Sequence, residues 1–552
     1  MTEQDHPRQP GRLTVAPVSP ASQAGSIALP DLDAIESGAT TARPPVTDDA
    51  IQFERPVPLT DDGAPREPRP EIAGALPVSA PRARTTVTPR AGGTLSDWRY
   101  GADAWRLNRR LTRRQANLML RLRTARAIPA AWRARFSAMG LPDDVVDETL
   151  GDIRSLDTWA DAWIATAQRY LGDFRRQVSA GNKIDGARNQ AMAGLCYHIA
   201  QIVTDPADRR TAIMCRAAAA SLFTHALPYV YQNATKIAVP WRSKTLPGYL
   251  HVPADRETDE RAGLVVILNG TSSSKEETFT WASAFMRAGL AVLALDSPGT
   301  GEAARTPFAA DQDDILDGVF DLLAADPRLD LNATIVVGMS LGGNQALRCA
   351  AYDRRIAGIV AVTAPMTPAR WIDRISPILG DELLAMTGSD AASIVTLAQH
   401  LDLTETLSRV HCPVLAIGAG RDAIVPPNES QRIAEAFGPM GTLDWFPQSG
   451  HCLYDQIETW TLDAARWADA VAQGTREAAP LGRGGDRREQ ALAIAAQARD
   501  TLLASPALPP DGWDEPFDEG ARLLSEDEVL DDDPDWYAPA GETSPRTRQL
   551  RD

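Results

Sequence analysis

The chain has 552 residues with a hydrophobic content of 44%, enough for two or three domains with sizeable cores. Its net charge of -17 argues against nucleic acid or an anionic membrane as a partner, because the attraction to phosphate groups is missing. The five cysteines form no C-x-x-C pair and no metal-ligand spacing. We therefore expect reduced thiols, no metal, no cofactor and a cytoplasmic location.

The segment of residues 1–95 is rich in Pro, Ala, Thr and Asp and holds few aromatic side chains. Such a segment cannot bury enough apolar surface to offset the entropy lost on ordering. We predict that it is disordered and serves as a tether, with a docking arm for a partner protein as the alternative. It shows no basic region followed by an apolar one, so no signal peptide is expected.

Helical periodicity dominates residues 96–235. Apolar side chains recur at intervals of three and four, and no alternating strands interrupt them. The pattern predicts a helical domain, with helical segments at residues 103–110, 116–122, 159–164 and 191–198. Its most apolar part, residues 213–231, contains arginine, histidine and proline, and is too short and too polar to span a membrane.

Strands alternate with helices from residue 236 to residue 475. A hairpin is expected over 236–252, followed by apolar strands at residues 264–268, 290–295, 334–338, 356–362, 413–418 and 445–447. Runs that are apolar throughout are typical of parallel strands covered on both faces. The alternation predicts a mostly parallel, right-handed α/β sheet.

Two further segments do not follow this rhythm. Residues 365–401 interrupt the strands and are predicted to add a small lid. After residue 475, residues 487–503 are typical of an Ala-rich amphipathic helix. The rest of residues 476–552 is predicted to be a mostly disordered acidic tail, because blocks of like charge are usually solvated.

The strand ending at Gly338 runs directly into Gly338-Met339-Ser340-Leu341-Gly342. A G-x-S-x-G sequence between a strand and a helix forms a sharp turn that exposes the serine hydroxyl above the sheet. We therefore predict that Ser340 is a nucleophile. The N–H of Leu341, at a helix N-terminus, is predicted to donate to an oxyanion.

A serine nucleophile needs a base, and the base needs an acid that orients it. In this topology the chain order is serine, acid, histidine. Asp422 follows the strand at residues 413–418, and His451 lies on a Gly-flanked turn after the last strand. These positions predict a triad of Ser340, Asp422 and His451. Asp296 precedes the nucleophile, which is the wrong order for the catalytic acid. The Gly-rich segment 296–302 lacks the lysine and the following helix of a phosphate-binding loop, so it is predicted to be a structural turn at the mouth of the site.

The second oxyanion donor is expected in the loop of residues 269–274. This loop follows the strand at residues 264–268, and its small residues allow backbone N–H groups to face Ser340. Gly270 and Thr271 are the two candidates, and both stay open.

Three motifs together resemble a known family: Asn269-Gly270 with Ser273-Ser274-Lys275-Glu276-Glu277, Asp296-x-Pro298-Gly299-x-Gly301-Glu302, and Gly338-x-Ser340-Leu341-Gly342-Gly343-Asn344. They are similar to those of the fermentation/respiration switch protein-like branch of the α/β-hydrolases, which includes 2,6-dihydropseudooxynicotine hydrolase and fungal heptaketide-shortening hydrolases. The resemblance covers about residues 96–475. It implies an α/β-hydrolase fold with an N-terminal helical cap at residues 96–235 and the triad above. Some relatives cleave carbon–carbon bonds of β-diketone-like substrates, and others are esterases.

We therefore predict a serine hydrolase that cleaves an ester, a thioester or a ketone C–C bond of a small molecule through an acyl-enzyme. Two alternatives stay open, a non-catalytic binding or regulatory protein on the same scaffold and an acyltransferase. A C–C hydrolase must also protonate a carbanion or enolate leaving group, and the sequence identifies no acid for that step. A homodimer and a protein partner for the tails are further options.

Overall fold

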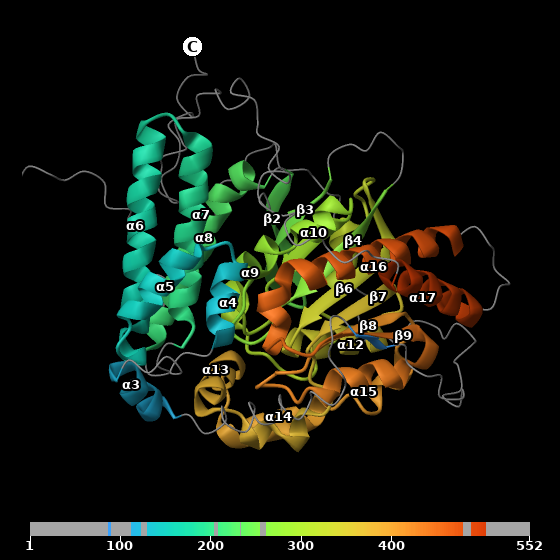
Figure 1. Cartoon of the computed structure of the whole chain (residues 1–552). Helices are drawn as coiled ribbons and strands as arrows, with labels where there is room; N and C mark the ends of the chain where they lie inside the picture. Colours follow the sequence, from blue (N-terminus) through green and yellow to red (C-terminus); the bar gives the residue numbers. More distant parts are fainter. Residues whose placement is uncertain are drawn as a thin grey trace, which may run out of the picture. The chain divides into compact units, whose positions relative to one another are not determined.

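The described part of the chain contains a nine-stranded sheet in the order β1-β9-β8-β7-β6-β4-β5-β3-β2. Figure 1 shows this sheet with helices packed around it. The strands are β1 (Val87–Pro89), β2 (Ala234–Trp241), β3 (Lys244–His251), β4 (Ala262–Leu268), β5 (Ala291–Leu295), β6 (Leu329–Met339), β7 (Ile356–Val362), β8 (Val414–Ala419) and β9 (Gly441–Phe446). The β2–β3 hairpin and the β3–β5 pair are antiparallel, and every other neighbouring pair is parallel. The predicted α/β sheet is confirmed.

This computed structural model describes residues 87–89, 112–122, 130–203, 208–231, 233–253, 261–478 and 487–503. The helix predicted at residues 103–110 and the acidic stretch after residue 503 lie outside the described residues, as does most of the segment 1–95. Within that segment, β1 pairs with β9 as an edge strand, where the sequence predicted disorder throughout. Valine and threonine favour extended backbone, and proline is tolerated at a sheet edge.

Both faces of the sheet are covered by helices, as expected for parallel strands. All seven residues of β4 are buried. One face packs on α11 (Asp317–Leu323), α12 (Leu341–Tyr352) and α15 (Asn428–Phe437), and the other packs on α10 (Ser283–Arg287), α16 (Ile457–Ala478) and α17 (Arg487–Leu503). The hydrophobic core therefore lies in two layers, one on each side of the sheet.

Six helices precede the sheet in the described residues and form the predicted helical region. They are α3 (Arg113–Arg121), α4 (Ala130–Ala138), α5 (Asp143–Asp152), α6 (Trp159–Ser179), α7 (Lys183–Gln201) and α8 (Arg209–Val230). Phe136 packs edge-on against Trp163, with ring centroids 5.1 Å apart, and Trp159 donates its indole N–H to the Ile199 carbonyl. These tryptophans are fully buried, so they form the core of the cap.

The insert between β7 and β8 forms two helices, α13 (Pro377–Thr387) and α14 (Ala391–His400). Helix α13 begins where the Ser376 hydroxyl accepts from the Leu379 N–H, with Pro377 in its first turn, and ends at Gly388, whose φ is +62°. These are ordinary start and stop signals for a helix. We refer to residues 365–401 as the lid.

Two short helices, α9 (Lys275–Thr280) and α10, lie between β4 and β5, and α11 precedes β6. The helix predicted at residues 487–503 is α17, and its Ala498 and Leu502 are buried in the same core layer as α16. Short 3-10 helices occur at Leu156–Thr158, Gly301–Arg305, Pro368–Arg370, Ile372–Arg374, Thr406–Arg409, Gly438–Met440 and His451–Gln456.

The five cysteines are free and buried. Among the residues that the structure describes, no helix is both long and apolar enough to cross a membrane.

Candidate active site

Ser340 occupies the turn between β6 and α12. Its φ is 52° and its ψ is -121°, a conformation in which residues other than glycine are strained. A Cβ on Gly338 would lie 2.2 Å from the Gly342 carbonyl oxygen, and a Cβ on Gly342 would lie 2.3 Å from that of Leu268. The turn therefore accepts only glycine at both positions. This is the geometry that the G-x-S-x-G pattern predicts.

Asp422 and His451 lie next to each other after β8 and β9. His451 Nδ1 is 2.7 Å from Asp422 Oδ2. The other carboxylate oxygen accepts the backbone N–H groups of Ile424 and Val425 at 2.8 and 2.9 Å. Asp422 is buried and held on both oxygens, so it fixes the orientation of the imidazole.

The charge of Asp422 also determines how basic the imidazole is. Burial lowers the pKa of His451, but the adjacent Asp422 carboxylate raises it, and the resulting pKa lies well above its ordinary value. Such an imidazole is a strong base when it is neutral, which is what proton removal from a serine hydroxyl needs.

Ser340 and His451 line one cavity of about 220 Å³. Its walls come from the β6–α12 turn, the loops after β4, β8 and β9, the cap and the lid. The wall side chains are mostly apolar and include Trp132 and Leu156 of the cap and Trp371, Ile375, Ile378, Leu379, Leu383, Ile394 and Leu397 of the lid. Besides His451, five wall residues have ionisable side chains: Arg135, Glu382, Arg421, Cys452 and Tyr454.

The predicted oxyanion residues Gly270, Thr271 and Leu341 line the same cavity. A Cβ on Gly270 would lie 3.0 Å from the Met339 carbonyl oxygen and 3.3 Å from Ser340 Cβ, so this loop packs directly against the serine turn. Leu341 is the first residue of α12, where backbone N–H groups have no acceptor within the helix. The geometry leaves both Gly270 and Thr271 as candidates for the second donor.

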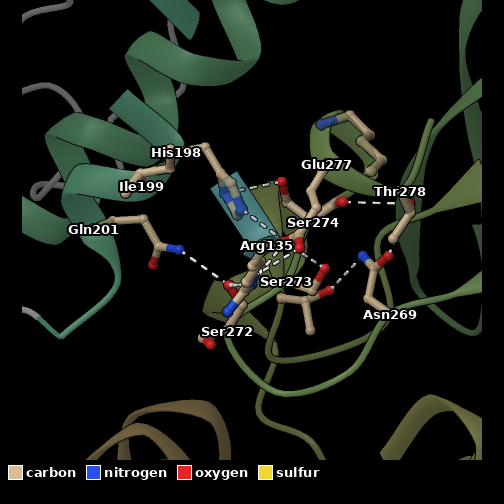
Figure 2. Close-up of polar contacts among 12 residues, drawn as sticks. Arg135, His198, Ile199, Gln201, Asn269, Ser272, Ser273, Ser274, Glu277 and Thr278 are labelled. Atoms are coloured by element: carbon tan, nitrogen blue, oxygen red, sulfur yellow. Dashed lines mark hydrogen bonds and ion pairs between the residues drawn. The ribbon is translucent and has the colours of Figure 1, made fainter. Parts of the chain in front are cut away.

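Figure 2 shows a polar network that joins this loop to the cap. At its centre the Glu277 carboxylate is almost fully buried, with 1% of the side chain exposed. It accepts hydrogen bonds from Arg135 of α4, His198 of α7, Ser273 of the loop and Tyr454, three residues after His451. Burial raises the pKa of Glu277, but the Arg135 guanidinium and His198 bring it far below its ordinary value. As a carboxylate, Glu277 only accepts, so His198 donates to it through Nε2.

Arg135 and Gln201 fix the loop from the cap side. Arg135 Nη2 donates to the Ser272 carbonyl at 3.2 Å, and Gln201 Nε2 donates to the same oxygen at 3.3 Å (Figure 2). Ser272 itself has a φ of +58°, a strained conformation that these bonds help to hold. We refer to residues 269–274, which hold the two candidates for the predicted second oxyanion donor, as the oxyanion loop. Its position therefore depends on two cap helices.

A second buried network lies beneath the loop, around Lys275 and Asp296, both fully buried. Lys275 Nζ is 3.0 Å from Asp296 Oδ2, 2.7 Å from Glu302 Oε2 and 2.5 Å from Glu276 Oε1. Asp296 Oδ1 also accepts from the Lys275 N–H at 2.8 Å and from Asn269 Nδ2 at 3.1 Å. The segment after β5 is thus an anchor for the loop.

Sequence reasoning assigned no role to Arg135, Lys275, Glu276, Glu277 or Glu382. A run of charged residues such as Lys275-Glu276-Glu277 usually lies in solvent, and nothing local indicates that all three are buried. For these three residues, the available signal in the sequence was their position directly after a strand and a serine-rich loop.

Comparisons with known proteins agree with the fold. Residues 265–470 match the Alpha/beta hydrolase family. The chain is 25% identical over 341 residues to 2,6-dihydropseudooxynicotine hydrolase of Paenarthrobacter nicotinovorans, covering 59% of this chain and 88% of that enzyme. It is 26% identical over 340 residues to the hydrolyase poxO of Penicillium oxalicum, covering 52% of this chain and 80% of the relative. The hydrolyase ccsE of Aspergillus clavatus is 30% identical over 252 residues, covering 36% of this chain and 58% of the relative.

Among solved structures, 2,6-dihydroxy-pseudo-oxynicotine hydrolase aligns with a TM-score of 0.55 and 24% identity, covering 61% of this chain and 95% of that one. This likeness shows a shared fold. With the family match and the hydrolases among the relatives, it confirms the resemblance that the three motifs indicated. The chain is a hydrolase built on an alpha/beta hydrolase domain, which the family match places at residues 265–470.

Proposed function

We propose that the enzyme is a serine hydrolase that forms an acyl-enzyme on Ser340, with His451 as the base and Asp422 as the group that orients it. The observation that carries this proposal is the 2.7 Å contact between His451 and Asp422 at a cavity whose wall includes the strained Ser340. Strain at a serine on this kind of turn is typical of a nucleophile.

In the first half of the reaction, neutral His451 takes the Ser340 proton as Oγ attacks the substrate carbonyl carbon. The Leu341 N–H and one N–H from Gly270 or Thr271 donate to the oxyanion that forms. The imidazolium returns the proton to a departing alcohol or thiol. In the second half, His451 activates a water that hydrolyses the acyl-enzyme, and Ser340 regains its proton.

The cavity favours a small and largely apolar acyl compound. Its volume of about 220 Å³ and its aliphatic lid wall suit such a substrate. An ester, a thioester and a ketone with a cleavable C–C bond all fit the proposal. A cytoplasmic location and a homodimer stay predictions.

Covalent labelling with a fluorophosphonate probe tests this function. We expect the wild type and Ser389→Ala to be labelled, because Ser389 is exposed and lies outside the cavity wall. Ser340→Ala and His451→Ala are expected to show no labelling. A folded wild type that reacts no faster than Ser340→Ala would overturn the proposal. Adding alcohol or amine acceptors to the acyl-enzyme then distinguishes a hydrolase from an acyltransferase.

A further inference from the structure

Glu382 places a carboxyl group in the cavity from the side of the lid. It lies on α13, its side chain is half-buried, and it lines the same cavity as Ser340 and His451. We propose that Glu382 is the acid that protonates an enolate leaving group when this enzyme cleaves a ketone C–C bond. The proposal rests on the serine hydrolase function above and adds a residue and a substrate class to it.

The first argument concerns Arg135, the nearest cation from the cap. Its guanidinium already makes two bonds to Glu277, at 2.7 and 2.6 Å, and a third to the Ser272 carbonyl. Both side chains of this ion pair are buried, with 8% and 1% exposed. Because Glu277 compensates the charge of Arg135, the cation does not need Glu382 as a partner. Glu382 is then a second carboxyl group near Arg135, and it lines the cavity.

The second argument concerns the protonation of Glu382. Burial raises its pKa to about 7, although Arg135 and a hydrogen bond with the Ser272 side chain lower it. The neighbouring carboxylate on α13, Asp381, also raises the pKa of Glu382. The other ionisable side chains on the cavity wall are His451, Arg421, Tyr454 and Cys452. At neutral pH a large share of Glu382 is therefore a carboxylic acid, the form that can donate a proton.

The third argument is a chemical need that the triad does not meet. When an ester is cleaved, the departing oxygen is bonded to the attacked carbon and can take its proton from His451. When a 1,3-diketone is cleaved, the electron pair of the broken C–C bond moves to an enolate whose oxygen is two carbons farther away. A proton donor elsewhere on the cavity wall suits that oxygen, and Glu382 is a donor on the lid wall.

The proton steps balance as follows. The Ser340 Oγ–C bond forms while His451 takes the serine proton, the C–C bond breaks, and Glu382 gives its proton to the enolate oxygen, releasing an enol that becomes a ketone. The imidazolium proton of His451 passes through water to the Glu382 carboxylate. Water then hydrolyses the acyl-enzyme with His451 as base. The sum is one ketone substrate and one water giving a carboxylic acid and a smaller ketone.

The rival explanation is that Glu382 only helps to hold the lid against Arg135. The two explanations differ in one measurable respect. A structural residue affects the cleavage of every substrate, whereas a leaving-group acid affects only a substrate whose leaving group needs the proton.

The test compares Glu382→Gln with Asp373→Asn, which removes an exposed lid carboxylate that lies off the cavity wall. Purified full-length enzymes are assayed from pH 5 to pH 9 with p-nitrophenyl butyrate, whose leaving group needs no acid, and with a panel of 1,3-diketones that includes benzoylacetone. We expect Glu382→Gln to lower kcat for the diketone by about 10²–10⁴ and to leave kcat for the ester within about twofold. The fall of diketone kcat/KM above about pH 7 should disappear in this variant. Asp373→Asn should keep both activities.

Three results would overturn the role of Glu382. They are an equal loss of both activities in Glu382→Gln, an unchanged diketone rate and pH profile, and a wild type that hydrolyses the ester but none of the diketones. Full activity of Ser340→Ala on both substrates would instead overturn the serine hydrolase function itself.

Discussion

The Arg135 guanidinium and the Glu277 carboxylate form a two-point ion pair across 142 residues of sequence, with N–O distances of 2.7 and 2.6 Å. Arg135 belongs to the cap, and Glu277 lies on α9, directly after the oxyanion loop. Because Arg135 also holds the Ser272 carbonyl, this pair connects the placement of the cap to the geometry of the loop beside Ser340.

Glu277→Gln should destabilise the protein strongly. It removes the charge that compensates the buried Arg135, and breaking a buried ion pair by removing one partner costs about 3–5 kcal/mol. The measurement is urea denaturation followed by tryptophan fluorescence. The control is Asp147→Asn, which breaks an exposed ion pair to Arg133 on the same helix and should leave the denaturation midpoint in place. Equal midpoints for the two variants would show that the buried pair adds nothing.

Asp422→Asn should lower the rate and move its pH dependence. The variant loses the carboxylate that raises the pKa of His451. The asparagine side chain that replaces it no longer fixes the tautomer of the imidazole. Since the proposed reaction needs neutral His451, ester kcat/KM of the wild type should rise with pH through the raised pKa of His451. In the variant this rise should move to lower pH, with kcat lower by on the order of 10³–10⁴. A pH–rate profile at the wild-type position would contradict the assignment of Asp422.

Gly270→Ala should impair catalysis more than folding. The added Cβ would lie 3.0 Å from the Met339 carbonyl oxygen, so the loop must move by a few tenths of an ångström away from Ser340. We expect kcat to fall by up to about 10²-fold with little change in KM, because an oxyanion donor is misplaced. Gly151→Ala is the matched control, since its Cβ meets nothing within 4 Å. The Gly151→Ala variant, whose substitution lies in helix α5, should keep full activity and have a free energy of unfolding higher by roughly 0.5–1 kcal/mol.

Lys275→Met should give a protein whose stability improves in acid. Burial raises the pKa of Glu276, but Lys275 brings it down to about 2, and Lys275 also lowers the pKa of Glu302. Without the cation, the buried carboxyls should have pKa values above those of the unfolded chain. Their stabilising contribution is then present at low pH and lost as the pH rises through the raised values.

The deficit in the free energy of unfolding of Lys275→Met, relative to the wild type, should therefore be largest near pH 8 and become smaller toward pH 4.5. Urea midpoints across this range measure it. Lys236→Met removes a partly exposed partner that also lowers the pKa of Glu302, so its deficit in the free energy of unfolding should be much smaller and depend only weakly on pH. If the deficit of Lys275→Met were the same at every pH, the pKa values of these carboxyl groups would not change between the unfolded and folded states, and the prediction would be wrong.

The parts of this protein that the sequence alone determined are those with a local physical cause. Buried parallel strands are apolar throughout, so the strands from β4 to β8 were predictable within a few residues. Gly338 and Gly342 are required by contacts within one turn. Asp422 and His451 follow neighbouring strands, and the carboxyl ends of parallel strands meet at one edge of a sheet.

The tertiary structure decided what depends on distant partners. The local sequence predicts an exposed charged run at Lys275, Glu276 and Glu277, but all three are buried. Their charges are compensated in the fold, where Asp296 and Glu302 pair with Lys275 and the cap pairs with Glu277. The ionisation of Glu382 likewise depends on a cavity built from the lid, the cap and the oxyanion loop. No local pattern encodes a charge balance among groups that are 21 to 142 residues apart in the sequence, since this balance exists only when folding removes the groups from water.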